Sequence, residues 1–349
     1  MRLIFVSDRK DAHVKRFSNL FRSLTKNYIE VVYSRESGKF VGSSPDLDCA
    51  NWGSLRSKIE EEPSVVVSGP LDSVSQHLKG GDYRHVGISW ATDVMVSARH
   101  SWDALTQLSE TVRLLDYVLT DNYATENVLI SLGTQPESVL RFPWGPGEPV
   151  LGNQAHKRSD FGLPEGKTLI LSLRNMEPHY EPETVLQAFA ALSSKIPEAQ
   201  LVLVRRGSGI SSAEDLIGSL GLSEKVTWVE TLEPGQFNSL IASVNVVVSS
   251  AKTDGTAVSV LEAMAQGIPV VATLTNGSAE WLVDGITGWT YAPGQEAALE
   301  TKLSQVLSMD IGHKKAIVTN AQKLVASRAG WAQTSNALSE TLSRLLRGT

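Results

Sequence analysis

Short apolar runs alternate with longer segments of helical spacing along almost the whole chain. The run LIFVS at 3–7 is typical of a buried strand. The segment at 12–25 then places its apolar residues on one helical face. Further apolar runs at 64–69, 85–90 and 117–122 continue the alternation. Strands that alternate with helices indicate parallel βαβ units, so we predict an α/β protein with doubly wound, Rossmann-like sheets.

A stretch rich in glycine, proline and polar residues interrupts this pattern between 144 and 162, and such composition is typical of a domain boundary. The pattern restarts at 168–173, so we predict an N-terminal domain over 1–150 and a C-terminal domain over 151–325. The tail, 326–349, is expected to be helical and to pack back on the N-terminal domain. Because doubly wound sheets bind ligands at the carboxyl ends of their strands, we expect the site in a cleft between the domains.

The composition is that of an ordinary globular protein, with 42% hydrophobic and 20% charged residues. No apolar stretch reaches the roughly 18 residues of a membrane span, and charges follow too soon after the N-terminus for a secretory signal. The single Cys49 cannot form an internal disulfide. We therefore expect a cytoplasmic protein. The formal net charge of −6 argues against a dedicated nucleic-acid binder.

The first 40 residues are basic, with nine Lys or Arg residues against four acids. Five of these cations lie in or beside the helix predicted at 12–25: Lys10, Lys15, Arg16, Arg22 and Lys26. Such a face attracts anionic lipid headgroups or a diphospholipid acceptor, which would place the protein at the inner face of the membrane. The alternative is a solvated helix face without a partner.

The segment 249–289 contains the most informative chemistry. A predicted strand, 244–250, ends in a loop that contains Asp254 and Gly255. We predict Thr256 as the N-cap of a helix from about Ala257 to Gln266. The free amide groups of its first turn favour an anion, and glycine lets a phosphate approach the backbone closely.

Glu262 lies about six residues into that helix, or roughly 9 Å along it. One carboxylate before the helix and one on its flank would hold two ends of an elongated ligand, because carboxylates accept hydrogen bonds from paired sugar hydroxyls. The alternative is an ordinary strand–loop–helix unit with two solvated acids.

The segment resembles the C-terminal signature of glycosyltransferase family 4, in which a Glu, seven residues and a second Glu stand in an LEAMA.G.PVVAT context. The matching positions are Asp254 and Glu262, followed by AMAQGIPVVAT. The resemblance implies that Glu262 binds the ribose hydroxyls and that Asp254 contacts the transferred sugar. Asp254 is one methylene shorter than the commoner glutamate, and Ser278 replaces the second glycine of a downstream pair.

A second motif, LSLRNMEPHYEPETVLQAF at 171–189, provides cationic candidates. Family members have an arginine after the first strand of this domain and commonly a lysine about five residues later, both on the diphosphate. Arg174 occupies the arginine position, and a surface salt bridge is its alternative role. The lysine is missing; His179 stands there, as a ligand contact or a surface residue. Arg206, beside Arg205, is expected either to contact phosphate or to pair with an acid.

The N-terminal half resembles the family more faintly. GISWATDVM at 87–95 is similar to an SWGSD pattern, which makes Asp93 the acceptor-side candidate, with a helix cap as its alternative. The paired glycines that many relatives carry in the first loop are absent. Lys10 or His13 in that loop are candidates for a donor-phosphate contact, although a solvated surface is the favoured interpretation.

The resemblance implies a GT-B fold, with two Rossmann-like domains facing a cleft, and a retaining transfer from a UDP- or GDP-sugar to a glycan, lipid-linked or small-molecule acceptor. No metal or other cofactor is expected. In place of a metal cation, the departing diphosphate would be stabilised by Arg174 and by the amides of Gly255, Thr256, Ala257 and Val258. Asp46 and Asp48 spell a metal-binding Asp-x-Asp, but this spelling is common by chance.

Two other functions fit the same residues. One is a sugar-nucleotide epimerase of similar two-domain build, which needs no acceptor. The other is a non-catalytic member that only binds a partner, which the departures at Asp254 and at the missing lysine keep open.

Overall fold

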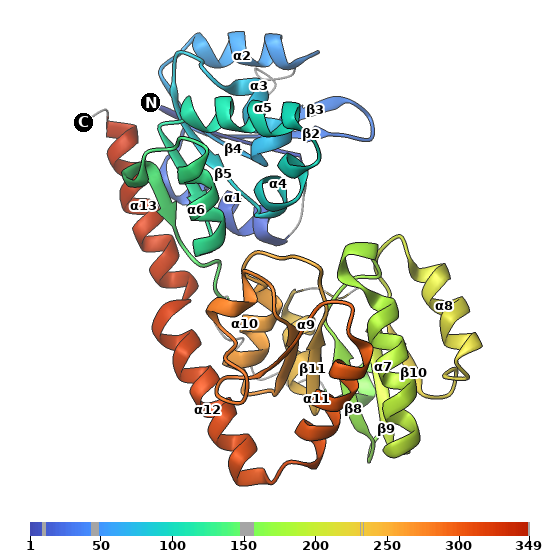
Figure 1. The fold of residues 1–349 in the computed structure, drawn as a ribbon. Helices are drawn as coiled ribbons and strands as arrows, with labels where there is room; N and C mark the ends of the chain where they lie inside the picture. The colour runs from blue at the N-terminus through green and yellow to red at the C-terminus, as the bar shows by residue number, and fades with distance from the viewer. Residues whose placement is uncertain (9–11, 43–48, 147–156, 231, 233, 348–349) are drawn as a thin grey trace. The chain divides into compact units, whose positions relative to one another are not determined.

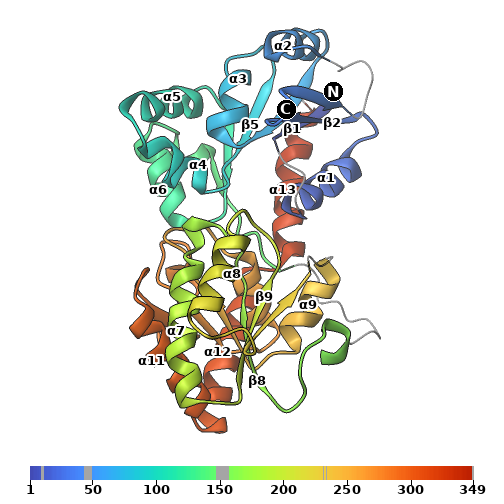
Figure 2. The ribbon, with the colours of Figure 1, turned by 90° about the vertical axis from the view of Figure 1, so that its right-hand side faces the viewer.

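The computed structural model describes residues 1–8, 12–42, 49–146, 157–230, 232 and 234–347. The chain forms two compact units (Figure 1). The first consists of Met1–Pro143 and Ala332–Thr349, and the second of Trp144–Trp331. Each unit has its own sheet with helices on both faces (Figures 1 and 2).

The sheet of the first unit has seven strands in the described residues, in the order β3-β2-β1-β4-β5-β6-β7. Its strands are β1 (Arg2–Ser7), β2 (Tyr28–Ser34), β3 (Lys39–Gly42), β4 (Ser64–Gly69), β5 (Arg84–Ile88), β6 (Tyr117–Thr120) and β7 (Val139–Arg141). Neighbours pair in parallel except for the antiparallel pair β2–β3. Every residue of β4 is buried, as expected for a central strand covered on both faces.

Short helices connect these strands. They are α1 (Ala12–Leu24), α2 (Trp52–Glu60), α3 (Gln76–Leu78), α4 (Thr92–Met95), α5 (Trp102–Arg113) and α6 (Tyr123–Ser131). On β1, Phe5 packs edge-on against Phe21 of α1, with ring centroids 5.0 Å apart. Ile4, the adjacent residue on β1, belongs instead to a cluster with Leu55 and Ile59 of α2. The alternation of side chains along a strand therefore attaches helices to both faces of the sheet.

The sheet of the second unit has six strands in the described residues, in the order β10-β9-β8-β11-β12-β13, all parallel. They are β8 (Thr168–Ser172), β9 (Ala199–Val204), β10 (Val226–Val229), β11 (Val246–Ser249), β12 (Val270–Thr273) and β13 (Trp289–Tyr291). The helices are α7 (Pro182–Lys195), α8 (Ile210–Ser219), α9 (Pro234–Ala242), α10 (Val258–Ala265), α11 (Glu296–Ser308) and α12 (Ile311–Arg328). The strand–helix alternation predicted from the sequence is confirmed.

The core of this unit has two layers because successive residues of β8 point to opposite faces. Leu169 and Leu171 share one cluster with residues of α9, α10 and α12. Ile170 lies in the other cluster, with residues of α7, α8 and α11. The carboxyl ends of β8 and β11, which are hydrogen-bonded neighbours, are thereby held side by side.

The helical tail is broken between Arg328 and Trp331. Helix α12 ends at Arg328, and α13 (Trp331–Arg347) begins three residues later. From Ala332 onward this last helix belongs to the first unit. Thr334 donates a hydrogen bond to the carbonyl of Pro143 at 2.9 Å, which attaches α13 to the segment after β7.

Candidate functional site

The loop between β11 and α10 forms the centre of the candidate site. Strand β11 ends at Ser249, and α10 begins at Val258. The N-cap is Ala257, so the predicted cap at Thr256 is wrong by one residue. Since alanine has no side-chain acceptor, the N-cap leaves the first-turn amides without a side-chain cap. Gly255 and Thr256 are buried in the loop ahead of them. Amides of this kind favour an anionic ligand.

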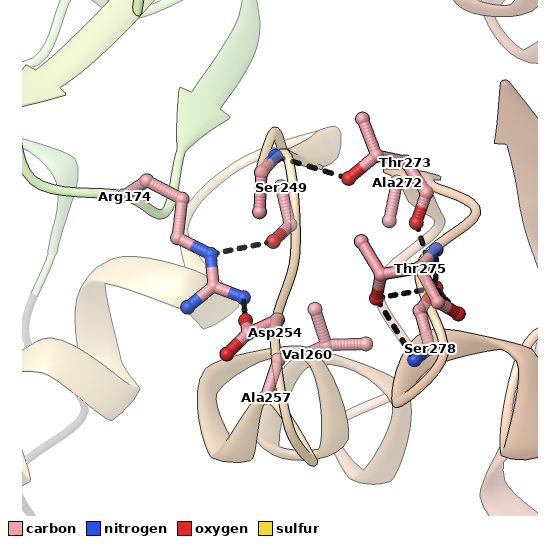
Figure 3. Close-up of a pocket in the computed structure, with 10 residues that line it drawn as sticks. Arg174, Ser249, Asp254, Ala257, Val260, Ala272, Thr273, Thr275 and Ser278 are labelled. Carbon is pink, nitrogen blue, oxygen red and sulfur yellow. Dashed lines mark hydrogen bonds and ion pairs between the residues drawn. The ribbon is translucent and has the colours of Figure 1, made fainter. Parts of the chain in front are cut away.

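Arg174 follows β8 and reaches across to this loop. Its Nε donates to Ser249 Oγ at 2.8 Å, and its guanidinium forms an ion pair with the Asp254 carboxylate (Figure 3). The guanidinium carbon lies 4.9 Å from the centre of the Tyr180 ring, a cation–π distance. The Arg174 side chain is 12% exposed and that of Asp254 is 18% exposed. Three contacts therefore hold one partly buried cation at the carboxyl ends of two neighbouring strands.

A small pocket lies beside the ion pair. Its lining residues are Arg174, Ser249, Ala251, Asp254, Ala257, Val260, Ala272, Thr273, Thr275 and Ser278 (Figure 3). Its volume of about 10 Å³ is about what one water molecule needs. Thr275 and Ser278 bond to each other on the side away from Arg174: the Thr275 amide donates to Ser278 Oγ at 2.8 Å. The pocket itself is too small to contain a nucleotide.

Gly277 makes the closest backbone approach to this loop. A Cβ placed on it would lie 2.0 Å from the Gly255 carbonyl oxygen and 2.8 Å from that of Asp254. No real Cβ tolerates such contacts, so a side chain at 277 would displace the loop. Gly277, which directly precedes Ser278, is thus required by close packing against the loop.

The segment after Arg174 is fixed to the turn after β9. The Met176 amide donates to the Arg206 carbonyl, and the Gly209 amide donates to the Met176 carbonyl, at 2.8 and 2.7 Å. The carboxylate of Glu177 accepts two hydrogen bonds from Ser208, which hold its pKa below the usual range. This turn keeps the Arg174 loop in place.

The two arginines of this turn have different surroundings. Arg205 pairs with Glu214 at 2.7 Å and lies 4.7 Å from the Trp228 ring centre. Arg206 is exposed, and the contacts that the structure gives it are made by its backbone. A phosphate contact by the Arg206 side chain remains a prediction.

His179 is exposed next to the site, with its ring 3.9 Å from that of Tyr180. Partial loss of hydration lowers the pKa of its imidazole. Its carbonyl accepts a hydrogen bond from the Lys252 amide at 2.9 Å. Glu262 lies in the second turn of α10 with a partly exposed side chain.

Asp93 in the first unit has a different environment from the one expected of an acceptor contact. It is 2% exposed. Its Oδ2 accepts from the Leu71 amide at 2.9 Å, and its Oδ1 accepts from Ser89 Oγ at 2.8 Å and from the Trp90 amide at 3.1 Å. Both oxygens therefore hold the surrounding backbone. We assign Asp93 a structural role, close to the helix-cap alternative, instead of acceptor binding.

Several sequence candidates lie outside the described residues: Lys10, Asp46, Asp48 and the side chain of His13. Within the described residues, no group of three or more His, Cys, Asp or Glu side chains is arranged to hold a metal ion. None of the helices described is long and apolar enough to cross a membrane.

Two residues, Ser249 in the pocket lining and Lys252 in the loop before Asp254, are not among the candidates that the sequence provides. Ser249 was recognised only as the end of a strand, although its position beside β8 is what brings it to Arg174. Lys252 stands in a polar loop where nothing in the sequence distinguishes it from any solvated lysine.

Comparison with solved structures gives the class of fold. HepE of Anabaena in complex with UDP-glucose matches with a TM-score of 0.82 and 15% identity, over 99% of this chain and 100% of that chain. The sucrose-phosphate synthase from Thermosynechococcus elongatus matches with a TM-score of 0.79 and 16% identity, over 100% of each chain. The two parallel-sheet units have the GT-B fold, as predicted.

The sequence of the second unit gives the family. Residues 153–324 match the family described as Glycosyl transferases group 1. This confirms the resemblance detected in the motifs that contain Arg174 and Asp254.

The curated relatives are named as glycosyltransferases. D-inositol 3-phosphate glycosyltransferase of Nocardia farcinica is 28% identical over 204 residues, which is 56% of this chain and 44% of that protein. The protein of the same name from Mycobacterium tuberculosis is 24% identical over 192 residues, 54% of this chain and 39% of that protein. The chain thus spans less than half the length of these relatives.

Proposed function

We propose that this chain is a retaining glycosyltransferase that moves a sugar from a nucleotide-diphosphate sugar to an acceptor hydroxyl. The observation that carries the proposal is the meeting of Arg174, Asp254 and the first turn of α10 at the carboxyl ends of β8 and β11. These groups offer a guanidinium, uncapped amides and a carboxylate in one place, which suits a diphosphate joined to a sugar.

Arg174 has the hydrogen-bonding capacity for this role. A guanidinium has five N–H donors in a planar fork. Ser249 takes the Nε donor and Asp254 takes one terminal nitrogen. The other terminal nitrogen has donors for phosphate oxygens, so Arg174 could bind a diphosphate without first releasing Ser249.

In the proposed reaction, the bond between the sugar and the diphosphate breaks and negative charge grows on the leaving group. Arg174 and the α10 amides are already in place to stabilise that charge. Asp254 would accept hydrogen bonds from sugar hydroxyls, and Glu262 from ribose hydroxyls, as the family resemblance implies. We propose that this step needs no metal, because Arg174 and the α10 amides would contact the leaving diphosphate directly.

A UDP-sugar is the favoured donor, with a GDP-sugar as the alternative. HepE, with the same fold, is described in complex with UDP and with UDP-glucose. The acceptor class stays broad: a glycan, a lipid-linked molecule or a small molecule. The name of the curated relatives makes D-inositol 3-phosphate a sensible first acceptor to try.

The test is a nucleotide-release assay with UDP-, GDP- and ADP-sugars, with and without acceptors and with a chelator in a parallel arm. We expect acceptor-dependent release that survives chelation, and thermal stabilisation by the matching nucleotide. Epimerised or free sugar without acceptor would favour the epimerase alternative. Absence of stabilisation by every nucleotide would remove the proposal.

A secondary proposal concerns the basic face of α1. Lys15 and Lys26 are exposed. Arg22 lies 3.4 Å from Glu30, so part of the charge of this face is already neutralised. Contact with an anionic membrane surface would therefore depend more on Lys15 and Lys26 than on Arg22. Flotation with anionic and with neutral vesicles tests this, and equal binding to both would contradict it.

A further inference from the structure

The charge at the candidate site leaves a diphosphate incompletely neutralised. A diphosphate carries more than one negative charge at neutral pH. Arg174 offers one positive charge, but Asp254 forms an ion pair with it. The first turn of α10 adds the equivalent of only about half a charge. A site built from these groups alone would be short of positive charge for the proposed donor.

Lys252 is the cation in the right place to make up this difference. It lies in the same loop as Asp254, two residues earlier, and its side chain is exposed. Its amide is hydrogen-bonded to the carbonyl of His179 at 2.9 Å. Two residues before it, Ser250 Oγ donates to the Tyr180 carbonyl at 2.5 Å. These two hydrogen bonds anchor the backbone around Lys252 to His179 and Tyr180. Tyr180 is the residue whose ring makes the cation–π contact with Arg174.

The charge of Lys252, like those of Arg174 and Asp254, acts on the His179 imidazole. Among the described residues, no carboxylate forms an ion pair with Lys252. Loss of hydration lowers the pKa of the His179 imidazole, which disfavours its charged form.

We propose that Lys252 is the second cation of the diphosphate site and binds the donor together with Arg174. This inference rests on the proposed function, since it assigns a further residue to the same donor. The lysine would add a flexible point charge at the rim of the site, while Arg174 forms the fixed, directional contact.

The experiment measures binding of UDP, inorganic pyrophosphate and uridine by titration calorimetry. Lys252→Met is expected to weaken UDP and pyrophosphate by about tenfold, the scale of one charge-assisted contact, and to leave uridine binding unchanged. Lys252→Arg should keep most of the affinity. The matched control is Lys323→Met. Lys323 is an exposed lysine of α12, and its neighbour Gln322 contacts the carboxyl end of α10, away from the site.

A charge-relocation variant separates charge from backbone effects. His179→Lys added to Lys252→Met places an ammonium on the residue whose carbonyl anchors Lys252, and it should restore pyrophosphate binding. If wild-type protein binds UDP or pyrophosphate and Lys252→Met binds them equally well, this inference is wrong and the proposed function stands. If the wild-type protein binds neither pyrophosphate nor UDP, GDP or ADP, both fail.

Discussion

Arg174 and Asp254 are 80 positions apart in the sequence, and their side chains form an ion pair. Each follows a different strand of the second sheet, and β8 and β11 are neighbours in that sheet. The Asp254 carboxylate is thus paired with Arg174, the cation that the donor diphosphate would need. A ligand at this site therefore has to share Arg174 with Asp254, and the two residues should respond differently to mutation.

Asp254→Asn should separate donor binding from sugar transfer. Loss of the carboxylate leaves the guanidinium unneutralised, so UDP affinity should stay equal or rise about two- to fivefold. Transfer should fall by at least about tenfold, because the amide is a weaker partner for sugar hydroxyls. Calorimetry and an activity assay measure the two effects separately. Glu214→Gln, at the Arg205 ion pair of the same unit, is the control. Weaker UDP binding by Asp254→Asn would show that the carboxylate does not compete with the nucleotide.

Gly277→Ala tests the close approach of backbone to the site loop. The backbone at Gly277 has φ −75°, which any residue adopts, so only steric contact with Gly255 opposes a side chain. We expect a loss of about 1–3 kcal/mol in the free energy of unfolding, typical of overpacking, together with weaker UDP binding. Gly218→Ala is the matched control: it lies in α8 with nothing within 4 Å of an added Cβ, and it should gain about 0.5–1 kcal/mol. Equal stability of the two variants would show that the loop yields to a methyl group.

Much of the fold could be predicted because parallel strands are buried on both faces. Strands β1, β4 and β8 each contain three or more consecutive apolar residues and stand out in the sequence. Strand β3 was not anticipated, since only Phe40 of its four residues is buried. Strand β13 has three residues and gives too short a pattern. Short edge strands depend on their neighbours more than on their own sequence.

The sequence marks Arg174 and Asp254 as candidates, but it does not predict that they form an ion pair. Arg174 and Asp254 each follow a recognisable strand, whereas their pairing depends on loop geometry that no local pattern encodes. Asp93 shows the opposite failure. A polar residue after a strand suggests ligand contact, but the amides of Leu71 and Trp90 use its oxygens instead. Nothing in the sequence shows that Leu71, 22 positions earlier, would lie there.

The turn beside Asp93 contains a strained residue. Ala91 has φ 63° and ψ −46°, and the Thr92 amide donates to the Trp90 carbonyl at 2.8 Å, which defines a γ-turn. Non-glycine residues in such conformations cost about 1–3 kcal/mol. Ala91→Gly should therefore be at least as stable as wild type, although Ala91 is buried. Ala98→Gly, equally buried in a 3₁₀ turn, should lose about 1 kcal/mol. Urea unfolding compares them, and an equal loss in both would contradict strain at Ala91.

His85 should make the stability of the chain depend on pH. It is 2% exposed, and its Nε2 lies 2.7 Å from Ser68 Oγ. Burial lowers the pKa of its imidazole to about 3; the nearby Asp116 raises this pKa and Arg56 lowers it. Both the folded and the unfolded chain carry a neutral His85 at pH 7. Below about pH 6.5 the unfolded chain binds a proton at His85 that the folded chain excludes. The free energy of unfolding therefore decreases as the pH is lowered from about 6.5 to about 3.

The slope from His85 alone is about 1.4 kcal/mol per pH unit below the unfolded pKa. Urea unfolding at pH 7.5, 6.5, 5.5 and 4.5 should show this loss in the wild-type protein, in addition to the contributions of other groups. His85→Gln removes the titrating group while its amide can still bond to Ser68, so its profile should be flatter by about that slope. His100→Gln, an exposed histidine of the same unit, should follow the wild-type profile. If His85→Gln and wild type lose stability in parallel, a proton reaches His85 in the folded protein and the burial argument fails.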